Sequence, residues 1–198
     1  VNNIDLVEAE KRGIAVRNVS GYSTDSVVQS TFAHLLSLLG DSPYFDDCVK
    51  SGRYSSMSIF CDISHPNTEI VGKTLGIIGL GTIGKRVAAI AGMFGMKVIY
   101  YSTSGTSHCK LYPSVSLDEL LESSDVVSIH APLNERTRSL IGQAQLAKMK
   151  KSALLLNLGR GGIVDEEALA FAVDNGVIAG AALDVFEKEP LPATSPLL

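Results

Sequence analysis

The chain has no tryptophan, few cysteines and no long apolar run. Its three cysteines, Cys48, Cys61 and Cys109, are widely spaced, odd in number and free of any Cys-x-x-Cys pair, which argues against a disulfide framework and against a zinc site. We therefore expect reduced thiols and no bound metal. No apolar run approaches the roughly 20 residues of a membrane span, and residues 1–5 lack a signal-peptide pattern. We expect a cytoplasmic protein that does not enter a membrane.

Clusters of basic residues are missing as well. The formal net charge is −4, and no block of Lys and Arg occurs. Nucleic-acid phosphates favour clustered cations, so we expect no nucleic-acid partner. The chain is 45% hydrophobic, which is enough to bury a core. This composition is typical of a soluble globular protein.

From residue 74 onward, short β-branched runs alternate with longer amphipathic segments. Near-continuous apolar runs are typical of parallel strands that are covered on both faces. They predict strands at 74–79, 97–101, 125–129, 153–157 and 177–183. Helices are predicted between them at 82–95, 116–123, 143–149 and 165–175. Ser116 and Asp165 give the second and fourth of these helices an N-cap signal. The alternation predicts an α/β fold, with a doubly wound parallel sheet of Rossmann type.

The first 72 residues follow another pattern. Residues 12–18 look like one strand, and residues 23–39 look like a capped helix of about four turns that ends at Gly40. Residues 41–72 are rich in Ser, Asp, Pro and Gly and predict a linker or surface excursion. The helix has a broad apolar face, which we expect to pair two chains into a homodimer. That face comprises Val27, Val28, Thr31, Phe32, Leu35, Leu36 and Leu39.

A glycine-rich motif follows the first of the later strands. Residues 79–84 read Gly-Leu-Gly-Thr-Ile-Gly and lie between a predicted strand and a predicted helix. Gly79 can form the tight turn, Gly81 can let a pyrophosphate approach the backbone, and Gly84 can let the helix pack on the strand. The helix N-terminus supplies N–H groups and the positive end of a dipole. The motif predicts a dinucleotide-binding site.

The residue that should select the dinucleotide is unusual. An acidic residue is expected about 20 residues after the motif, at the end of the second strand, but the chain has Ser102 there. No Asp or Glu in residues 100–105 would repel a 2′-phosphate, and no Arg is adjacent to bind one. The choice between NAD and NADP stays open. We expect weak discrimination with a modest preference for NAD.

Four stretches together make the chain resemble the D-isomer-specific 2-hydroxyacid dehydrogenases. They are residues 18–28, the glycine motif, residues 130–137 and residues 149–166, and the last stretch, with residues 182–190 after it, is the most specific. The resemblance implies hydride transfer between a nicotinamide and C2 of a small 2-hydroxy or 2-oxo acid. It also implies a homodimer that pairs through its cofactor domains.

The resemblance assigns roles to individual residues. The Arg of the family's Asn-x-Gly-Arg-Gly-Gly stretch binds the substrate's carboxylate and carbonyl, which implies that role for Arg160. A guanidinium fork at the carboxyl end of a parallel strand also suits a 2-oxo acid. Glu189, five residues after Asp184, matches the acid that holds the family's catalytic His and raises its pKa. The residues that the resemblance places along the cofactor are Thr82, Ile83, Ser102, Pro132, Thr137, Leu158, Gly159, Arg160 and Asp184.

The four histidines have weaker assignments. His130 falls at a strand end, where it borders the nicotinamide side or is a hydrogen-bonded wall residue. His34, His65 and His108 are expected to be structural or exposed. None of the four matches the family's catalytic His, which we expect to lie outside this chain.

The chain is also shorter than the family it resembles. Members have a flavodoxin-like substrate domain, built from both chain ends, around a central cofactor domain. By resemblance, residues 1–22 are a remnant of the substrate domain, and residues 23–198 are the NAD(P)-binding domain with its crossing helix 23–39. We expect the isolated chain to bind cofactor with negligible turnover. The alternative is a cofactor-sensing interaction protein, similar to the transcriptional corepressors built on the same fold.

Overall fold

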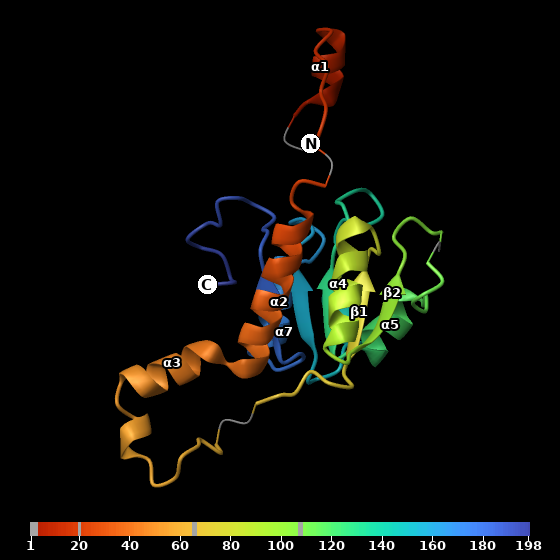
Figure 1. The fold of residues 1–198 in the computed structure, drawn as a ribbon. Coiled ribbons are helices and arrows are strands. Elements are labelled where there is room, and N and C mark those ends of the chain that lie inside the picture. The colour runs from red at the N-terminus through yellow and green to blue at the C-terminus, as the bar shows by residue number, and fades with distance from the viewer. Residues whose placement is uncertain (1–3, 20, 65–66, 107–108) are drawn as a thin grey trace.

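A five-stranded parallel sheet forms the centre of the molecule (Figure 1). The computed structural model describes residues 4–19, 21–64, 67–106 and 109–198. The strand order is β2-β1-β3-β4-β5, and every pair is parallel. The chain order thus reverses after β2, which confirms the predicted doubly wound sheet. The strands are β1 (Thr74–Ile78), β2 (Lys97–Tyr101), β3 (Val126–Ile129), β4 (Leu154–Asn157) and β5 (Gly180–Leu183).

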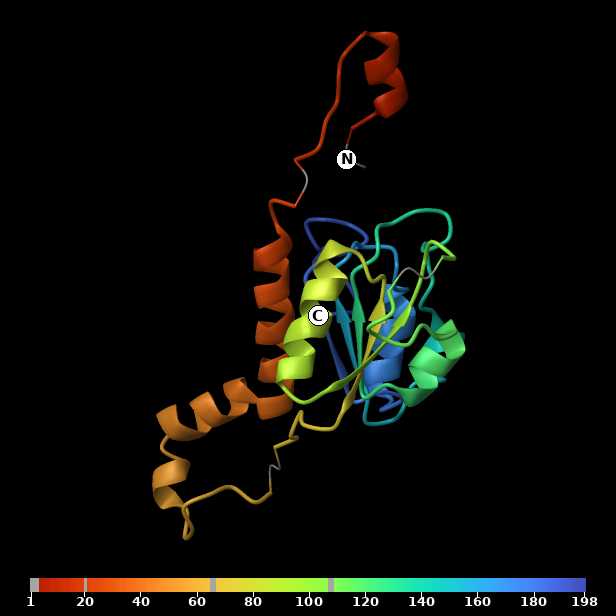
Figure 2. The same ribbon diagram turned by 45° about the vertical axis from the view of Figure 1, so that its right-hand side comes forward.

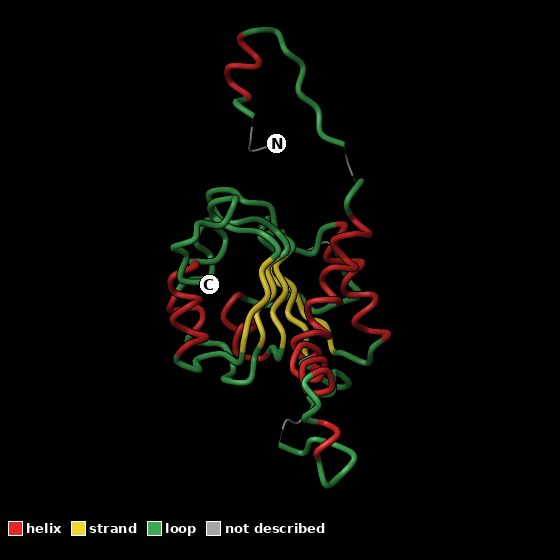
Figure 3. The backbone as a smooth tube through the Cα atoms, turned by 90° about the vertical axis from the view of Figure 1, so that its left-hand side faces the viewer, coloured by secondary structure: helices red, strands yellow, loops and turns green. Residues whose placement is uncertain are grey.

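Helices cover both faces of the sheet, as the views in Figures 2 and 3 show. Helices α2 (Thr24–Gly40) and α4 (Thr82–Met93) pack on one face. Helices α5 (Leu117–Ser123), α6 (Gln143–Leu146) and α7 (Glu166–Asp174) pack on the other. The strands are therefore buried on both faces, which explains their continuous apolar runs.

The predicted helix caps are confirmed at two of three positions. The side chain of Ser116 accepts a hydrogen bond from the backbone nitrogen of Glu119, and that of Asp165 accepts one from Ala168. The side chain of Ser23 makes no such bond at the start of α2. At the other end of that helix, Asp41 takes the left-handed conformation, with φ of 41°, so the helix includes Gly40.

The N-terminal segment differs from the prediction. A short helix, α1 (Leu6–Lys11), precedes residues 12–18, which form no strand. Among the described residues, none pairs with this segment as a neighbouring strand, and a lone strand leaves its backbone N–H and C=O groups without partners. The predicted strand is therefore wrong for this structure. The domain boundary predicted after residue 22 stays a prediction.

The segment predicted as a linker contains helical structure. Helix α3 (Ser42–Lys50) and the 3₁₀ turn η1 (Tyr54–Ser56) lie within it. Pro43 lies in the first turn of α3, a position that proline favours, so a start signal was present in the sequence. Figure 1 shows that this segment, which we call the arm (residues 41–64), extends away from the sheet.

The apolar face of α2 packs against other elements of the same chain. Val28, Thr31, Phe32 and Leu35 are buried against the sheet and α4. Of the face predicted to pair two chains, Leu36 is the residue with a large exposed side chain, at 42%. The face on which the homodimer prediction was based is therefore largely unavailable for a partner.

The amino ends of the strands are tied together by Asp125. Its carboxylate accepts a hydrogen bond of 2.8 Å from the backbone nitrogen of Thr74 and one of 2.9 Å from Nζ of Lys150. These residues precede or begin β1, β3 and β4. Burial raises the pKa of Asp125, but the Thr74 hydrogen bond and the Lys150 ammonium outweigh it and lower the pKa below its usual 3.8. The network joins the amino ends of these strands, at the end of the sheet opposite the glycine loop.

Candidate functional site

The three glycines of the loop between β1 and α4 have different surroundings. Gly79 has φ of 93°, and a Cβ on it would lie 2.9 Å from the backbone nitrogen of Ala131. A Cβ on Gly84 would overlap the carbonyl oxygen of Gly79, whereas one on Gly81 would meet no atom within 4 Å. The fold thus requires Gly79 and Gly84, and Gly81 leaves open space beside the backbone.

The N-terminus of α4 is available to a ligand. Gly81 is its N-cap residue and has no side chain with which to cap the helix. The first N–H groups of a helix have no partner within it, and here they point past Gly81 with the positive end of the helix dipole. This arrangement fits the pyrophosphate of a dinucleotide.

Two cavities flank the loop and share His130 and Pro132. The first has a volume of about 340 Å³ and extends to the end of β2, where Ser102 lines it. The second has a volume of about 350 Å³ and is lined by Ile83, Leu158, Gly159 and Arg160 among others. Their sizes and their places on either side of the glycines fit the two halves of a dinucleotide.

Four of the residues predicted to line the cofactor do not line these cavities. Gly84 is buried beneath the loop, Thr82 is exposed, and Asp184 is exposed near His34, whose Nε2 lies 3.9 Å from its carboxylate. Thr137 is fully buried, and its hydroxyl donates to the carbonyl of Pro132 at 2.7 Å and accepts from the backbone nitrogen of Asn134 at 2.8 Å. Thr137 therefore shapes the wall of the site through the turn that holds Pro132.

His130 is held as a neutral ring. Its Nε2 lies 2.9 Å from the hydroxyl of Ser128, and its Nδ1 is buried without a partner among the described residues. Burial lowers the pKa of His130 to about 4. A ring with that pKa is almost entirely the neutral imidazole at pH 7, so it is not available as a general acid. His130 is thus a wall residue of both cavities and a poor proton donor for catalysis. His34 is half-exposed on α2, and His65 and His108 lie outside the described residues.

A tight turn after β4 positions Arg160. The amide of Asn157 donates from Nδ2 to the carbonyl of Arg160 at 3.0 Å, and its Oδ1 accepts from the nitrogen of Gly159 at 3.1 Å. Asn157 is buried, so it fixes the turn from the core side. The guanidinium of Arg160 is exposed and donates to the carbonyl of Gly159 at 2.7 Å.

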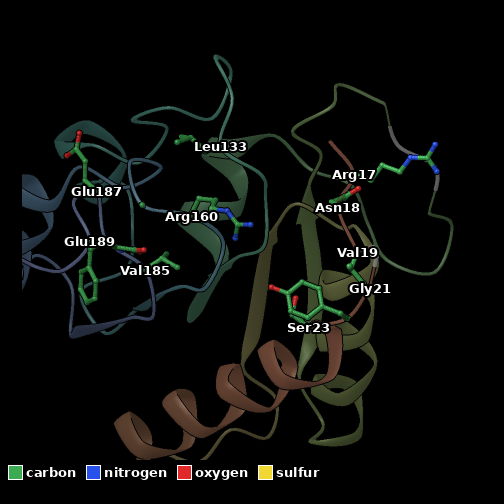
Figure 4. Close-up of a pocket in the computed structure, with 13 residues that line it drawn as sticks. Arg17, Asn18, Val19, Gly21, Ser23, Leu133, Arg160, Val185, Glu187 and Glu189 are labelled. Carbon is green, nitrogen blue, oxygen red and sulfur yellow. The ribbon is translucent and has the colours of Figure 1, made fainter. Parts of the chain in front are cut away.

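Arg160 also lines a larger cavity, of about 990 Å³ (Figure 4). One wall of this cavity is built from residues 17–19 and 21–23, and the other from the turn at Arg160, residues 185–187 and Glu189. In Figure 4 the guanidinium of Arg160 points into the space between the walls, whereas that of Arg17 points away from it. Arg160 is therefore placed where a carboxylate or carbonyl could reach it from the open side.

Glu189 lies on the same wall of this cavity. Its carboxylate accepts a hydrogen bond of 2.9 Å from the backbone nitrogen of Phe186, which holds the segment 186–189 in a compact turn. The neighbouring Glu187 is fixed at its backbone nitrogen, which donates to Glu166 at 2.6 Å. The fold thus brings the two residues predicted to be catalytic, Arg160 and Glu189, to one cavity.

Residues 32–198 match the model of the NAD binding domain of D-isomer specific 2-hydroxyacid dehydrogenases. The chain belongs to the D-isomer specific 2-hydroxyacid dehydrogenase family. This match confirms the resemblance seen in the sequence and the predicted cofactor class. The region matched includes the glycine loop, the turn at Arg160 and most of the lining of both cavities beside the loop.

Several known proteins resemble the chain over nearly all of its length. A glyoxylate reductase of Korarchaeum cryptofilum is 41% identical over 100% of this chain and 60% of its own length. The structure of D-lactate dehydrogenase from Aquifex aeolicus, complexed with NAD and lactic acid, has a TM-score of 0.86 at 38% identity and covers 96% of this chain and 56% of that chain. An acyclic imino acid reductase in complex with NADPH and D-Arg has a TM-score of 0.86 at 32% identity, with 98% and 60% covered. The chain spans less than two thirds of each of these proteins.

Sequence reasoning missed several residues of the site. Lys85 and Asn134 line the first cavity with Ser102, and Arg136 donates a hydrogen bond to the carbonyl of Ser104, another lining residue. The strand order explains this, because β2 and β3 flank β1, so the loops after them meet on either side of the glycine loop. That order was not fixed by the sequence pattern.

The described residues show no sign of two further features. No three of their His, Cys, Asp or Glu side chains lie close enough together to hold a metal ion. Within the same ranges, each helix is too short or too polar to cross a membrane.

Proposed function

We propose that the protein carrying this chain is an NAD(P)-dependent oxidoreductase that interconverts a D-2-hydroxy acid and its 2-oxo acid. One observation carries the proposal: Arg160 lines both the cavity beside the glycine loop and the large cavity next to it. A cation that lines two adjoining cavities can hold a small acid in one of them, next to a cofactor bound in the other.

We propose the following roles within that site. The loop from Gly79 to Gly84 binds the pyrophosphate, and the bound nicotinamide supplies or accepts the hydride. Arg160 binds the carboxylate of the substrate in the bidentate manner that a guanidinium favours, and polarises the 2-oxo group. Glu189 supports a catalytic His supplied by a part of the protein outside this chain, and raises the pKa of that His so that it can move the proton.

The names of the relatives support an enzyme. They include a glyoxylate reductase and a D-lactate dehydrogenase, which act on small 2-oxo or 2-hydroxy acids. These names give no support to the corepressor alternative. Which acid the protein converts depends on side chains opposite Arg160, and within this chain residues 17–19 and 21–23 lie there.

We further propose that the protein is a cytoplasmic homodimer that pairs through the arm. The arm exposes large apolar side chains, including Val49 at 60%, Phe60 at 87% and Ile63 at 78%. Such side chains, gathered on a segment that leaves the body of the molecule, are typical of an interface. Cys48, Cys61 and Cys109 are free thiols, which is usual for a reducing compartment.

Calorimetry tests the cofactor site directly. The change Gly81→Val fills space that is open in the structure, so the fold should persist while the pyrophosphate is excluded. NAD binding should be lost, and the circular dichroism spectrum should be unchanged. NAD binding by this variant as tight as by the parent protein would reject the dinucleotide site.

Turnover of a panel of 2-oxo acids tests the reaction. In the protein with its complete substrate domain, Arg160→Ala should abolish turnover and leave NAD binding intact, and Arg138→Ala is the matched control. The 198-residue chain alone should bind NAD but turn over negligibly, because a positioned acid–base group is worth about 10² to 10⁴ in rate. Rapid turnover by this chain alone would show that one of its own residues transfers the proton.

A further inference from the structure

We propose that Arg136 and Lys85, with the hydroxyls of the loop after β2, form a subsite for the 2′-phosphate of NADP. This inference rests on the dinucleotide site proposed above. It reverses the sequence-based preference for NAD, which depended on the lack of an Arg beside Ser102. The fold supplies that Arg from a loop 34 residues further along the chain.

The hydroxyl groups converge at the end of β2. The hydroxyl of Ser102 donates to the carbonyl of Thr106 at 2.6 Å and lies 3.1 Å from the hydroxyl of Ser104. The hydroxyl of Ser104 lies 3.2 Å from that of Thr106. Ser102, Ser104 and Thr106 all line the cavity of about 340 Å³ that extends from the glycine loop. Each hydroxyl can donate to a phosphate oxygen by rotating its hydrogen.

Arg136 is held beside these hydroxyls by an ordered turn. The buried hydroxyl of Thr137 accepts from the backbone nitrogen of Asn134, and Oδ1 of Asn134 accepts from the backbone nitrogen of Arg136 at 2.9 Å. The guanidinium of Arg136 then donates from Nη1 to the carbonyl of Ser104 at 3.3 Å. One donor is thus used to dock against the loop, and the guanidinium keeps others for a ligand.

Lys85 supplies a second positive charge to the same cavity. It lies in the first turn of α4 and lines the same cavity as Ser102 and Ser104. The lining of that cavity includes no Asp or Glu among the described residues. Within the same part of the chain, neither Lys85 nor Arg136 has a carboxylate within 4 Å. Two unneutralised cations beside a group of hydroxyls favour a dianion over a ribose hydroxyl.

The location within the fold sets the identity of the anion. The end of β2 is where an acidic residue would accept the ribose hydroxyls of NAD, and an Arg near this position accommodates a 2′-phosphate. Ser102 stands in place of that acid. The subsite is therefore placed for the phosphate on the adenosine ribose, and not for the pyrophosphate, which belongs at Gly81.

Titration calorimetry with paired ligands tests the inference without turnover. The ligands are NADP and NAD, and the fragments adenosine 2′,5′-bisphosphate and 5′-AMP. The parent protein should bind NADP at least as tightly as NAD, and the bisphosphate at least tenfold more tightly than 5′-AMP. Arg136→Ala should weaken NADP and the bisphosphate by about tenfold and change NAD by less than twofold. Lys85→Ala should act in the same direction.

Arg138→Ala is the matched control, because it removes the same charge from the same loop. Nη1 of Arg138 points towards Gly162, and a Cβ on that glycine would lie 4.0 Å from it. This variant should bind both dinucleotides like the parent protein. If NAD binds but NADP does not, or if Arg136→Ala weakens NAD and NADP equally, the subsite is rejected and the dinucleotide site stands. If the folded protein binds neither dinucleotide, the proposed function is rejected as well.

Discussion

Gly161 lies so close to the carbonyl group of Phe186 that a Cβ on Gly161 would overlap it. The contact joins the turn that positions Arg160 to the segment that ends at Glu189. Both partners of the overlap are backbone atoms or fixed to the backbone, so no side-chain rotation can relieve it. The two residues proposed for catalysis are thus held in register by a backbone contact at Gly161.

Gly161→Ala should therefore separate the two segments. We expect a loss of stability on the order of 1 to 3 kcal/mol, since overpacking at a fixed contact has about that cost. Turnover should fall further than the stability explains, because Arg160 and Glu189 would no longer face one substrate. Urea denaturation and turnover measure the two effects. Gly92→Ala is the control, since a Cβ there meets no atom within 4 Å and should stabilise α4. Equal behaviour of the two variants would contradict the prediction.

Ser102→Asp should penalise NADP. The new carboxylate would lie in the cavity where we place the 2′-phosphate, and two like charges in a poorly solvated site repel each other strongly. We expect NADP to bind at least tenfold more weakly, while NAD binds equally well or better. Ser102→Asn is the uncharged control of similar size. Unchanged NADP affinity in the Asp variant would show that Ser102 is not at the ribose.

His130 should titrate far below an ordinary histidine. Burial lowers its pKa to about 4, from 6.5 in the unfolded chain, so acid favours the unfolded state. This group should make the protein lose stability as pH falls from about 6.5 to about 4, by an amount on the order of 3 kcal/mol. An NMR titration of the ring gives the pKa directly. A midpoint between 6 and 7 would contradict both the burial and our exclusion of His130 as a proton donor.

Asp125→Asn should weaken the contacts that join the strands at their amino ends. The variant loses the ion pair with Lys150 and the charge that accepts from Thr74, which we expect to cost about 1 to 3 kcal/mol in the free energy of unfolding. Because the folded pKa lies below 3.8, this stabilisation is complete above pH 3.8 and is lost as pH falls through the folded value. Urea denaturation should show the full difference between parent and variant at pH 7 and a smaller difference near pH 3, below the usual pKa of 3.8. Asp46→Asn, in an exposed pair with Lys50, should have no measurable effect.

The arm should carry the dimer contact. Phe60→Ser together with Ile63→Ser removes two large exposed apolar side chains without touching the sheet. We expect the double variant to be monomeric at tens of micromolar, where the parent protein is dimeric, by sedimentation equilibrium. Phe171→Ser on α7, which is 55% exposed, is the control and should leave the dimer intact. A monomeric parent protein, or a dimeric double variant, would contradict the proposal.

The strands and the glycine loop were predictable because local pattern determines them. The apolar runs of β1 to β5 had to be buried on both faces, and the motif from Gly79 to Gly84 stood between strand and helix. The strand at residues 12–18 was not formed, because a strand depends on a neighbour that no local pattern can supply. Helix α3 was missed since its polar composition hid the start signal at Pro43.

The residues of the site also divide into those that a local motif predicts and those that depend on the fold. Arg160 stood in a specific motif and at a strand end, so its place was foreseen. Thr137 was expected at the cofactor and instead holds a turn with its buried hydroxyl. Arg136 was overlooked because its contact with Ser104 spans 32 residues and depends on the order of the strands. Contacts between loops that are distant in sequence follow from topology, which composition and spacing leave open.

The hydrogen-bond network of Asp125 lies at the amino ends of the strands, and the proposed binding residues lie at their carboxyl ends. Substitutions at the carboxyl ends of the strands can therefore change the preferred cofactor or acid, while the contacts at the amino ends keep the strands in place. A protein engineer could exchange the loops after β2, β3 and β4 and retain residues 74, 125 and 150, whose contacts hold the strands together.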